Sequence, residues 1–266
     1  MRSILALMRV AWLSAISYRI GTVISLVGLL ASVVPVFFIS RAVQSVAAAS
    51  ISAEGGDYFG FVIVGLAAVL VLSSAITAIP GALAGSIGSG TFESLTVTRT
   101  SLPVILMGMS GYPLLQSLLR AVMLIGGAAV LGVDVAWRLL PVVAVIVALL
   151  IIAYGAIGLF TAALVLVFRT SGPLITAVVA GSGLLGGVYY STAVIPGWIQ
   201  SLSGIVPLTY ALRSTRMLLL GGAPVSAVGG DVAILALIGA VGLALGSVAF
   251  SLALRHARAA GTLSQY

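Results

Sequence analysis

The sequence contains no cysteine, no lysine and a single histidine, His256, and only 6% of its 266 residues are charged. Without cysteine there is no disulfide and no thiolate nucleophile or metal ligand. Without lysine there is no complete phosphate-binding loop of the Walker A type and no Schiff-base lysine. A lone histidine close to the C-terminus leaves no histidine-centred triad. These absences argue against a self-contained enzyme.

Hydrophobic residues make up 61% of the chain, and its mean hydropathy is +1.31. Soluble domains carry about 25% charged residues, so this composition excludes an ordinary soluble globule and indicates an all-α integral membrane protein. The length suits roughly six spans of about 20 residues in a single transmembrane domain, residues 1–266. The apolar runs place these spans at about residues 20–40, 58–79, 112–132, 139–168, 173–190 and 232–254.

The arginines predict the orientation of these spans. With both termini inside, seven arginines share the inner side with the single acid Glu93, and four arginines and four acids share the outer side. This distribution follows the positive-inside rule and predicts cytoplasmic termini. The first span is longer than a signal-peptide core, so we expect it to be uncleaved. The lack of lysine and the abundance of alanine, glycine and valine suggest a GC-rich bacterial source, and hence a bacterial inner membrane.

Charge also bears on the energy source and on partners. All five acids fall in predicted loops or at span ends, whereas ion-coupled carriers usually place a carboxylate near the bilayer midplane. If the chain pumps a substrate, another subunit is therefore expected to supply the energy. The net charge of +7 comes from arginines that are scattered along the sequence. These arginines form no basic cluster in the sequence of the kind that binds nucleic acid.

The predicted inner loop at residues 88–102 has the pattern of a short helix. Ser89 or Gly90 can cap its start, and Glu93 in the first turn complements the helix dipole. Phe92 and Leu95 share one helical face, so such a helix could dock on a cytoplasmic partner. A plain solvated connection is the alternative interpretation.

This loop resembles the cytoplasmic loop of type-two ABC exporter permeases, which commonly reads Lys-Gly-Thr-Leu-Glu-x-Leu-x-Val-Thr-Pro. In that family the loop includes the coupling helix, which docks on a separate ATP-binding subunit. The residues of this sequence that match the pattern are Gly90, Thr91, Glu93, Leu95, Val97 and Thr98. The resemblance implies that the coupling contacts come from Thr91, Phe92, Glu93, Leu95, Val97, Thr98 and Arg99.

A second segment, residues 191–217, carries a Pro-Gly-Trp-Ile stretch followed by Pro-Leu-Thr-Tyr and two arginines. The run from Pro196 to Val206 is too short to cross a bilayer, and Pro207 interrupts it. It resembles the family's outer re-entrant half-helices between the fifth and sixth spans, although an ordinary interfacial helix would fit as well. The residues assigned to these half-helices are Pro196, Trp198, Pro207, Tyr210, Arg213 and Arg216.

The resemblance covers nearly the whole chain and begins with an interfacial helix at residues 1–19, in which Arg2 and Arg9 share a face. It implies a dimer of two permease copies or paralogues that forms the path for an amphipathic cargo: a lipid, a lipid-linked glycan or a hydrophobic drug. It also implies no cofactor in this chain, with ATP and Mg bound by the partner ATPase. An ion-coupled carrier and a non-transporting scaffold remain the alternative functions.

Three further features of the spans have two interpretations each. Arg120, with Gln116 as a candidate partner, either has a structural role or contacts an anionic group of the cargo. Arg213 and Arg216 either meet lipid phosphates or simply anchor the chain at the interface. The pairs Gly183/Gly187 and Gly242/Gly246 have GxxxG spacing, which we interpret mainly as packing within the chain.

Overall fold

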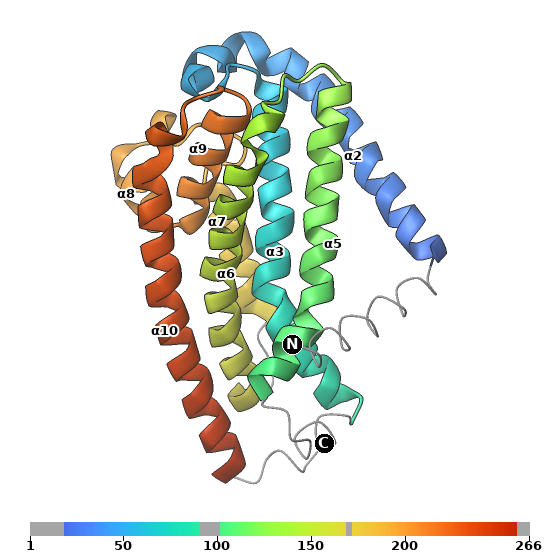
Figure 1. Cartoon of the computed structure of the whole chain (residues 1–266), viewed down its shortest axis with the longest axis vertical. Coiled ribbons are helices and arrows are strands. Elements are labelled where there is room, and N and C mark those ends of the chain that lie inside the picture. The colour runs from blue at the N-terminus through green and yellow to red at the C-terminus, as the bar shows by residue number, and fades with distance from the viewer. Residues whose placement is uncertain (1–18, 91–101, 169–171, 260–266) are drawn as a thin grey trace.

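The structure is a computed structural model that describes residues 19–90, 102–168 and 172–259, and within these ranges it is helical without strands (Figure 1). The principal helices are α2 Arg19–Ala47, α3 Tyr58–Gly88, α5 Leu102–Val130, α6 Leu140–Phe168, α7 Gly172–Leu185, α8 Gly197–Ser203, α9 Pro207–Leu219 and α10 Gly229–Ala259. Short 3₁₀ turns lie between them: η1 Ala48–Glu54, η2 Trp137–Leu139, η3 Thr192–Val194 and η4 Val225–Val228. The predicted all-α class is confirmed.

Five helices are long and apolar enough to cross a membrane, namely α2, α3, α5, α6 and α10. The chain is therefore a multi-pass membrane protein. The predicted fifth span, residues 173–190, is represented by α7, which has 14 residues. At 1.5 Å per residue α7 is about 21 Å long, short of the roughly 30 Å hydrocarbon core. It ends early because the chain turns at Gly187, whose φ of 74° lies in the left-handed region.

The boundaries of two predicted spans were wrong. We expected Pro80 to end the second span, but α3 continues through it to Gly88. Likewise α5 begins at Leu102, ten residues before the predicted start, and contains Pro113. Membrane helices tolerate such prolines because neighbouring groups satisfy the freed backbone. The connection between these two helices, residues 89–101, is correspondingly shorter than the predicted spans implied.

The residues that we expected to cap a coupling helix, Ser89 and Gly90, form the end of α3. The backbone N–H of Ser89 donates to the carbonyl of Gly85, and that of Gly90 donates to the carbonyl of Ile87. Gly90 has a φ of 67°, the left-handed conformation that commonly ends helices. The interfacial helix at residues 1–19 and the core of the predicted coupling loop fall outside the described residues, except for Arg19 at the start of α2.

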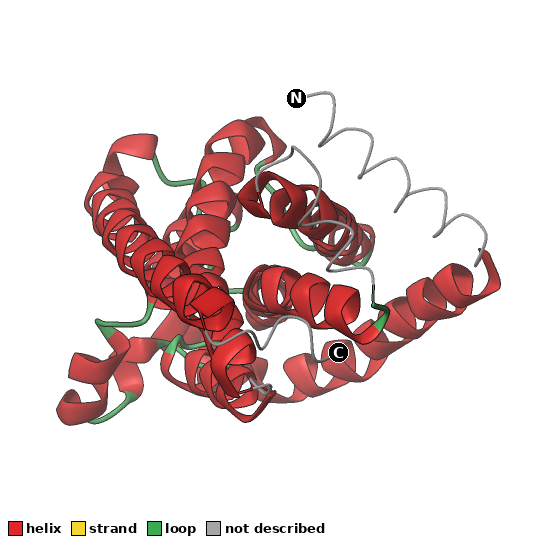
Figure 2. Ribbon diagram, turned by 90° about the horizontal axis from the view of Figure 1, so that it is seen from below, coloured by secondary structure: helices red, strands yellow, loops and turns green. Residues whose placement is uncertain are grey.

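Helix α3 is the centre of the bundle, with α5 on one side and α6 on the other, and α10 packs along α6 (Figure 1). Helix α2 contacts α3 and α5 near its C-terminal end and then diverges from them, as the view from below also shows (Figure 2). Large apolar side chains along α2 are accordingly exposed, including Leu30 and Phe38. In a membrane protein such a surface faces lipid or another protein.

The two GxxxG pairs differ in whether they pack one helix against another. On α10, a Cβ added at Gly246 would lie 2.6 Å from the carbonyl oxygen of Ala156, and one at Gly242 would lie 3.2 Å from the Ala156 Cβ. This pair therefore packs α10 against α6, as predicted. The other pair does not form a helical stripe, because Gly187 lies in the turn after α7 and Gly183 faces open space.

Four arginines and four acids gather at one end of the bundle, which we call the α9 end. It contains the C-terminal end of α2, η1, the start of α3, the α5–α6 connection, α9 and the start of α10. The charged residues of this end are Arg41, Glu54, Asp57, Asp134, Arg138, Arg213, Arg216 and Asp231. These are the residues that the sequence assigned to a common side of the membrane. Which side that is remains a prediction.

Candidate functional site

Helix α9 lies inside the α9 end, in contact with α3, α6, α10 and η1. Pro207 begins the helix at a position where its missing N–H costs no hydrogen bond. Leu208, Leu212 and Leu218 are each at most 1% exposed. Although α9 has polar residues on every turn, most of its side chains are buried, and each buried polar group therefore needs a partner.

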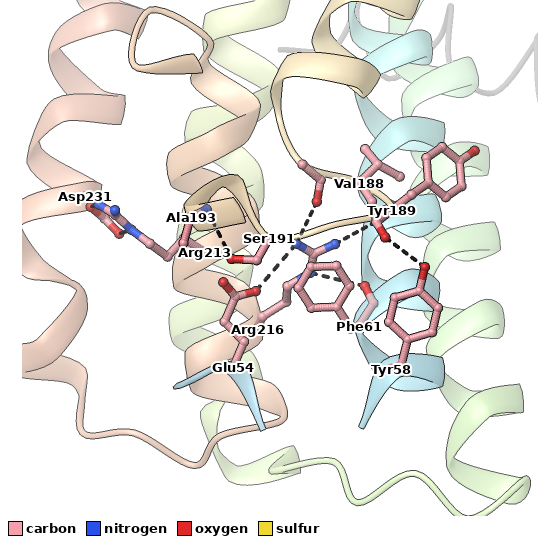
Figure 3. Close-up of polar contacts among 11 residues, drawn as sticks. Glu54, Tyr58, Phe61, Val188, Tyr189, Ser191, Ala193, Arg213, Arg216 and Asp231 are labelled. Atoms are coloured by element: carbon pink, nitrogen blue, oxygen red, sulfur yellow. Dashed lines mark hydrogen bonds and ion pairs between the residues drawn. The ribbon is translucent and has the colours of Figure 1, made fainter. Parts of the chain in front are cut away.

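Arg216 is the centre of this end, and its side chain is surrounded by protein (Figure 3). Its Nε donates to the carbonyl of Phe61 at 3.1 Å, and its two terminal nitrogens donate to the carbonyls of Gly187 and Val188, each at 2.9 Å. One terminal nitrogen lies 3.5 Å from a carboxylate oxygen of Glu54. We call these five residues the arginine junction.

The arginine junction satisfies the turn that follows α7, which ends at Leu185. The last carbonyls of α7 have partners nearby: those of Ser182 and Gly183 accept from backbone N–H groups of the turn, and that of Leu184 accepts from the Tyr190 hydroxyl. The carbonyls of Gly187 and Val188 lie within the turn itself, and an unpaired carbonyl in a membrane costs several kcal/mol. The planar fork of Arg216 reaches both of these carbonyls. The fork thus holds the turn from a different part of the chain.

Close packing holds the junction in place. The guanidinium carbon of Arg216 lies 3.3 Å from the centroid of the Phe61 ring. At Gly65, an added Cβ would lie 2.6 Å from the Val188 carbonyl oxygen and 2.9 Å from an Arg216 terminal nitrogen. A glycine is therefore required at this position of α3. Nearby, the Tyr58 hydroxyl donates to the carbonyl of Tyr189 at 2.8 Å, which ties the start of α3 to the same turn.

A second ion pair joins α9 to α10. The guanidinium of Arg213 binds both carboxylate oxygens of Asp231, with its Nε donating at 2.6 Å. Asp231 lies in the first turn of α10, where a negative charge also complements the helix dipole. The Arg213 side chain is half exposed and lies 5.9 Å from the centroid of the Tyr210 ring. Tyr210 itself donates to the carbonyl of Gly204 at 2.7 Å.

These contacts correct the expectation for Arg216. We expected Arg213 and Arg216 to meet lipid phosphates or to anchor the chain at the interface. Arg216 is only 2% exposed and is satisfied by backbone carbonyls and Glu54, so it is not available to lipid. Arg213 reaches the surface but already holds a carboxylate. Nothing in the sequence indicated that one turn of α9 separates a buried arginine from a half-exposed one.

Helix α8 presents its apolar residues outward. Pro196 precedes the helix, and Trp198 is 71% exposed. Leu202 and Ile205 are exposed as well, whereas Ser203, on the opposite side, is 2% exposed. The polar residues Gln200 and Ser201 are exposed as well, so α8 presents both apolar and polar side chains away from the bundle. Two short helices, α8 and α9, occupy the segment in which half-helices were predicted.

An apolar cavity of about 170 Å³ lies on the other side of α9 from Arg216. We call it the α5–α6 cavity. Its wall is formed by α3, α5, α6 and α9, and Thr215 is the one polar residue among the described residues that line it. The sequence predicted no cavity, because a void depends on how side chains of four helices meet.

Arg120, the candidate for the cargo path, does not face this cavity. Because α5 turns about 100° per residue, Arg120 lies roughly opposite Leu118 and Ile125, which line the cavity. It shares its face with Gly127, where an added Cβ would lie 3.7 Å from the side chain of Leu30 on α2. The Nε of Arg120 is buried and has no hydrogen-bond partner in the described part of the chain, so the expected pairing with Gln116 is not formed at this atom.

The residues predicted to contact an ATPase cannot be placed, because they lie outside the described residues. They are Thr91, Phe92, Glu93, Leu95, Val97, Thr98 and Arg99. The end of α3 and the start of α5, which this segment connects in the sequence, lie at the opposite end of the bundle from the arginine junction.

Sequence reasoning missed most of the arginine junction. Glu54, Phe61, Gly65 and the turn at Gly187 were not singled out, since they lie far from Arg216 in the chain. The signal that could have found Glu54 was the balance of four acids against four arginines on one predicted side. Opposite charges confined to one end of a membrane bundle tend to pair.

Comparisons with known proteins agree with this architecture. The family model for the ABC-2 type transporter matches residues 2–220, from the region before α2 to the end of α9. Among curated proteins, the sequence finds no significant match. Because the family model covers most of the chain, the chain belongs to the ABC-2 type transporter family and is a membrane transport component.

Proposed function

We propose that the chain is the membrane-spanning subunit of an ATP-driven exporter, and that a separate ATP-binding subunit, carrying ATP and Mg, supplies the energy. The observation that carries this proposal is the ABC-2 family match over residues 2–220, in a chain that has no lysine for a Walker A loop of its own. Two permease copies, or a copy and a paralogue, form the path. The complex resides in a bacterial inner membrane with both termini of the chain in the cytoplasm.

In this proposal, the two ends of the bundle have different tasks. The loop around Glu93 docks on the ATPase at one end, and closure of the ATPase pair moves this loop together with the ends of α3 and α5. At the α9 end, the arginine junction holds α9 to α3 and to the end of α7. Helix α8, with Trp198 exposed, is the part that meets the outer leaflet. An amphipathic cargo fits best, because both α2 and α8 expose apolar side chains.

The first test is purification of the chain from its native membrane in mild detergent, followed by mass spectrometry of whatever remains bound. We expect a stoichiometric companion that contains a P-loop. ATPase assays of the complex with candidate lipids, lipid-linked glycans and hydrophobic drugs then identify the cargo. A chain that is reproducibly free of such a companion in several gentle detergents would instead favour an ion-coupled carrier or a scaffold.

The coupling assignment predicts the effect of two substitutions. Glu93→Lys and Leu95→Gln are each expected to reduce transport to background while the complex still hydrolyses ATP, because docking transmits the motion of the ATPase to the spans. Transport and ATPase activity are measured together in proteoliposomes. Ser94→Gln, on the opposite face of the predicted helix from Phe92, is the matched control and should retain transport. Normal transport by both test variants would contradict the assignment.

A further inference from the structure

The α5–α6 cavity is not used by the arginine junction or by the coupling loop. It exists because small side chains from four helices face one another: Ala67 of α3, Ala121 of α5, Ala144 of α6 and Ala211 of α9. An apolar cavity of about 150 Å³ stays free of water and takes up a hydrocarbon the size of benzene. At about 170 Å³, this cavity has room for a short stretch of hydrocarbon chain.

The cavity opens sideways, between α5 and α6. Its deep wall is buried, with Val71 and Leu150 each 2% exposed, whereas Val122 on α5 is 58% exposed and Leu140 on α6 is 37% exposed. Helices α5 and α6 both pack on α3 and barely touch each other. Both helices are long and apolar enough to span the membrane, so the opening faces bilayer hydrocarbon rather than water.

The length of the cavity matches one leaflet. Along α6 its lining residues run from Leu140 to Leu150, a rise of about 15 Å. This is about half of the roughly 30 Å hydrocarbon core. Leu140 is the first residue of α6, at the α9 end, so a chain that enters from the leaflet at this end can lie along the cavity toward the middle of the membrane.

We propose that the α5–α6 cavity binds one acyl chain of a bilayer phospholipid, inserted between α5 and α6 against α3 and α9. The lining offers dispersion contacts to methylene groups and no charged side chain, which selects a hydrocarbon chain over a headgroup. The bound chain packs on Ala211 and Thr215, on a different face of α9 from Arg216. This inference depends on the cavity and on the membrane location, and not on ATP-driven export.

Photolabelling tests the proposal directly. The full chain is placed in nanodiscs of dioleoyl phosphatidylcholine that contain a small fraction of a phosphatidylcholine with a diazirine in its acyl chain. Light converts the diazirine to a carbene that inserts into nearby C–H bonds, and peptide mass spectrometry locates the labels. We expect several-fold more label at Val122 and Ala144 than at Leu119 and Val145, which are also exposed on α5 and α6 but do not line the cavity.

A matched pair of variants separates the cavity from the general lipid surface. Ala144→Phe places a ring in the opening, whereas Ala148→Phe adds the same ring one turn further along α6, at an exposed position outside the cavity. Label at Val122 should be lost in the first variant and retained in the second. If Ala144→Phe does not fold, Val122→Trp closes the opening from α5, with Leu119→Trp as its control and label at Ala144 as the readout.

Three results would overturn the proposal. Uniform labelling of all exposed apolar residues would show that the cavity holds no lipid chain in preference to the surface. Labelling that Ala144→Phe leaves unchanged, or that both phenylalanine variants reduce equally, would show that the label does not report the cavity. Labelling by a water-soluble diazirine alcohol but not by the phospholipid would exclude the bilayer as the source. None of these readouts involves ATP or a partner subunit.

Discussion

Replacing Arg216 with methionine is expected to lower the free energy of unfolding by about 3–5 kcal/mol, the usual cost of breaking a buried ion pair from one side. Methionine keeps much of the side-chain volume but removes every donor. The carboxylate of Glu54 would then be buried without its counter-charge, and the carbonyls of Phe61, Gly187 and Val188 would lose their hydrogen bonds. The change in the free energy of unfolding is measured on the purified chain in detergent, with circular dichroism monitoring its helix content during unfolding.

Two comparisons make this prediction specific to the arginine junction. Arg213→Met removes the same charge one turn away, but from a half-exposed ion pair, so we expect a much smaller loss of stability. Adding Glu54→Gln to Arg216→Met should recover part of the loss, because the amide carries no buried charge. Equal stability of Arg216→Met and Arg213→Met would contradict the structural role assigned to the junction.

The second large effect is expected at Gly246, where α10 crosses α6. A methyl group added by Gly246→Ala would lie 2.6 Å from the carbonyl oxygen of Ala156, a backbone atom that cannot move alone. The two helices must separate, which costs about 1–3 kcal/mol by analogy with overpacked cores. The expected result is a lower free energy of unfolding together with weaker protection of α10 in hydrogen exchange.

Gly183→Ala is the matched control, and its expected effect has the opposite sign. Gly183 lies within α7 and faces open space, so alanine gains about 0.4–1 kcal/mol by restricting the unfolded chain. The sequence gives both glycines the same GxxxG spacing, and only the packing distinguishes them. If both variants change the stability in the same direction and by the same amount, the assigned packing of α10 on α6 is wrong.

Hydropathy was sufficient for the class of fold, although six spans were predicted and five described helices are long enough to cross a membrane. The apolar runs placed five long helices, because an apolar stretch of span length has few alternatives to a helix in a membrane. Pro207 correctly divided α8 from α9. The prediction failed at Pro80, since a proline that would end a helix in water is accommodated in a bundle.

The candidate site was much less accessible to sequence reasoning. Arg216 was identified as a residue of interest, but its partners Glu54 and Phe61 lie more than 150 residues earlier in the chain. No local pattern records a contact over that distance. The α5–α6 cavity could not be predicted either, because alanines are common in membrane helices. They leave a cavity only where alanines of several helices face one another. Sequence motifs report local structure, and this site is made of tertiary contacts.

The hydrogen bonds from Arg216 to the turn after α7 also bear on how the protein is made. A ribosome delivers α7 to the membrane before α9 exists, because Arg216 lies 29 residues after Gly187. Until α9 is made, the guanidinium that binds the carbonyls of Gly187 and Val188 is missing. We therefore expect the turn after α7 to reach its final position only after the chain has passed Arg216.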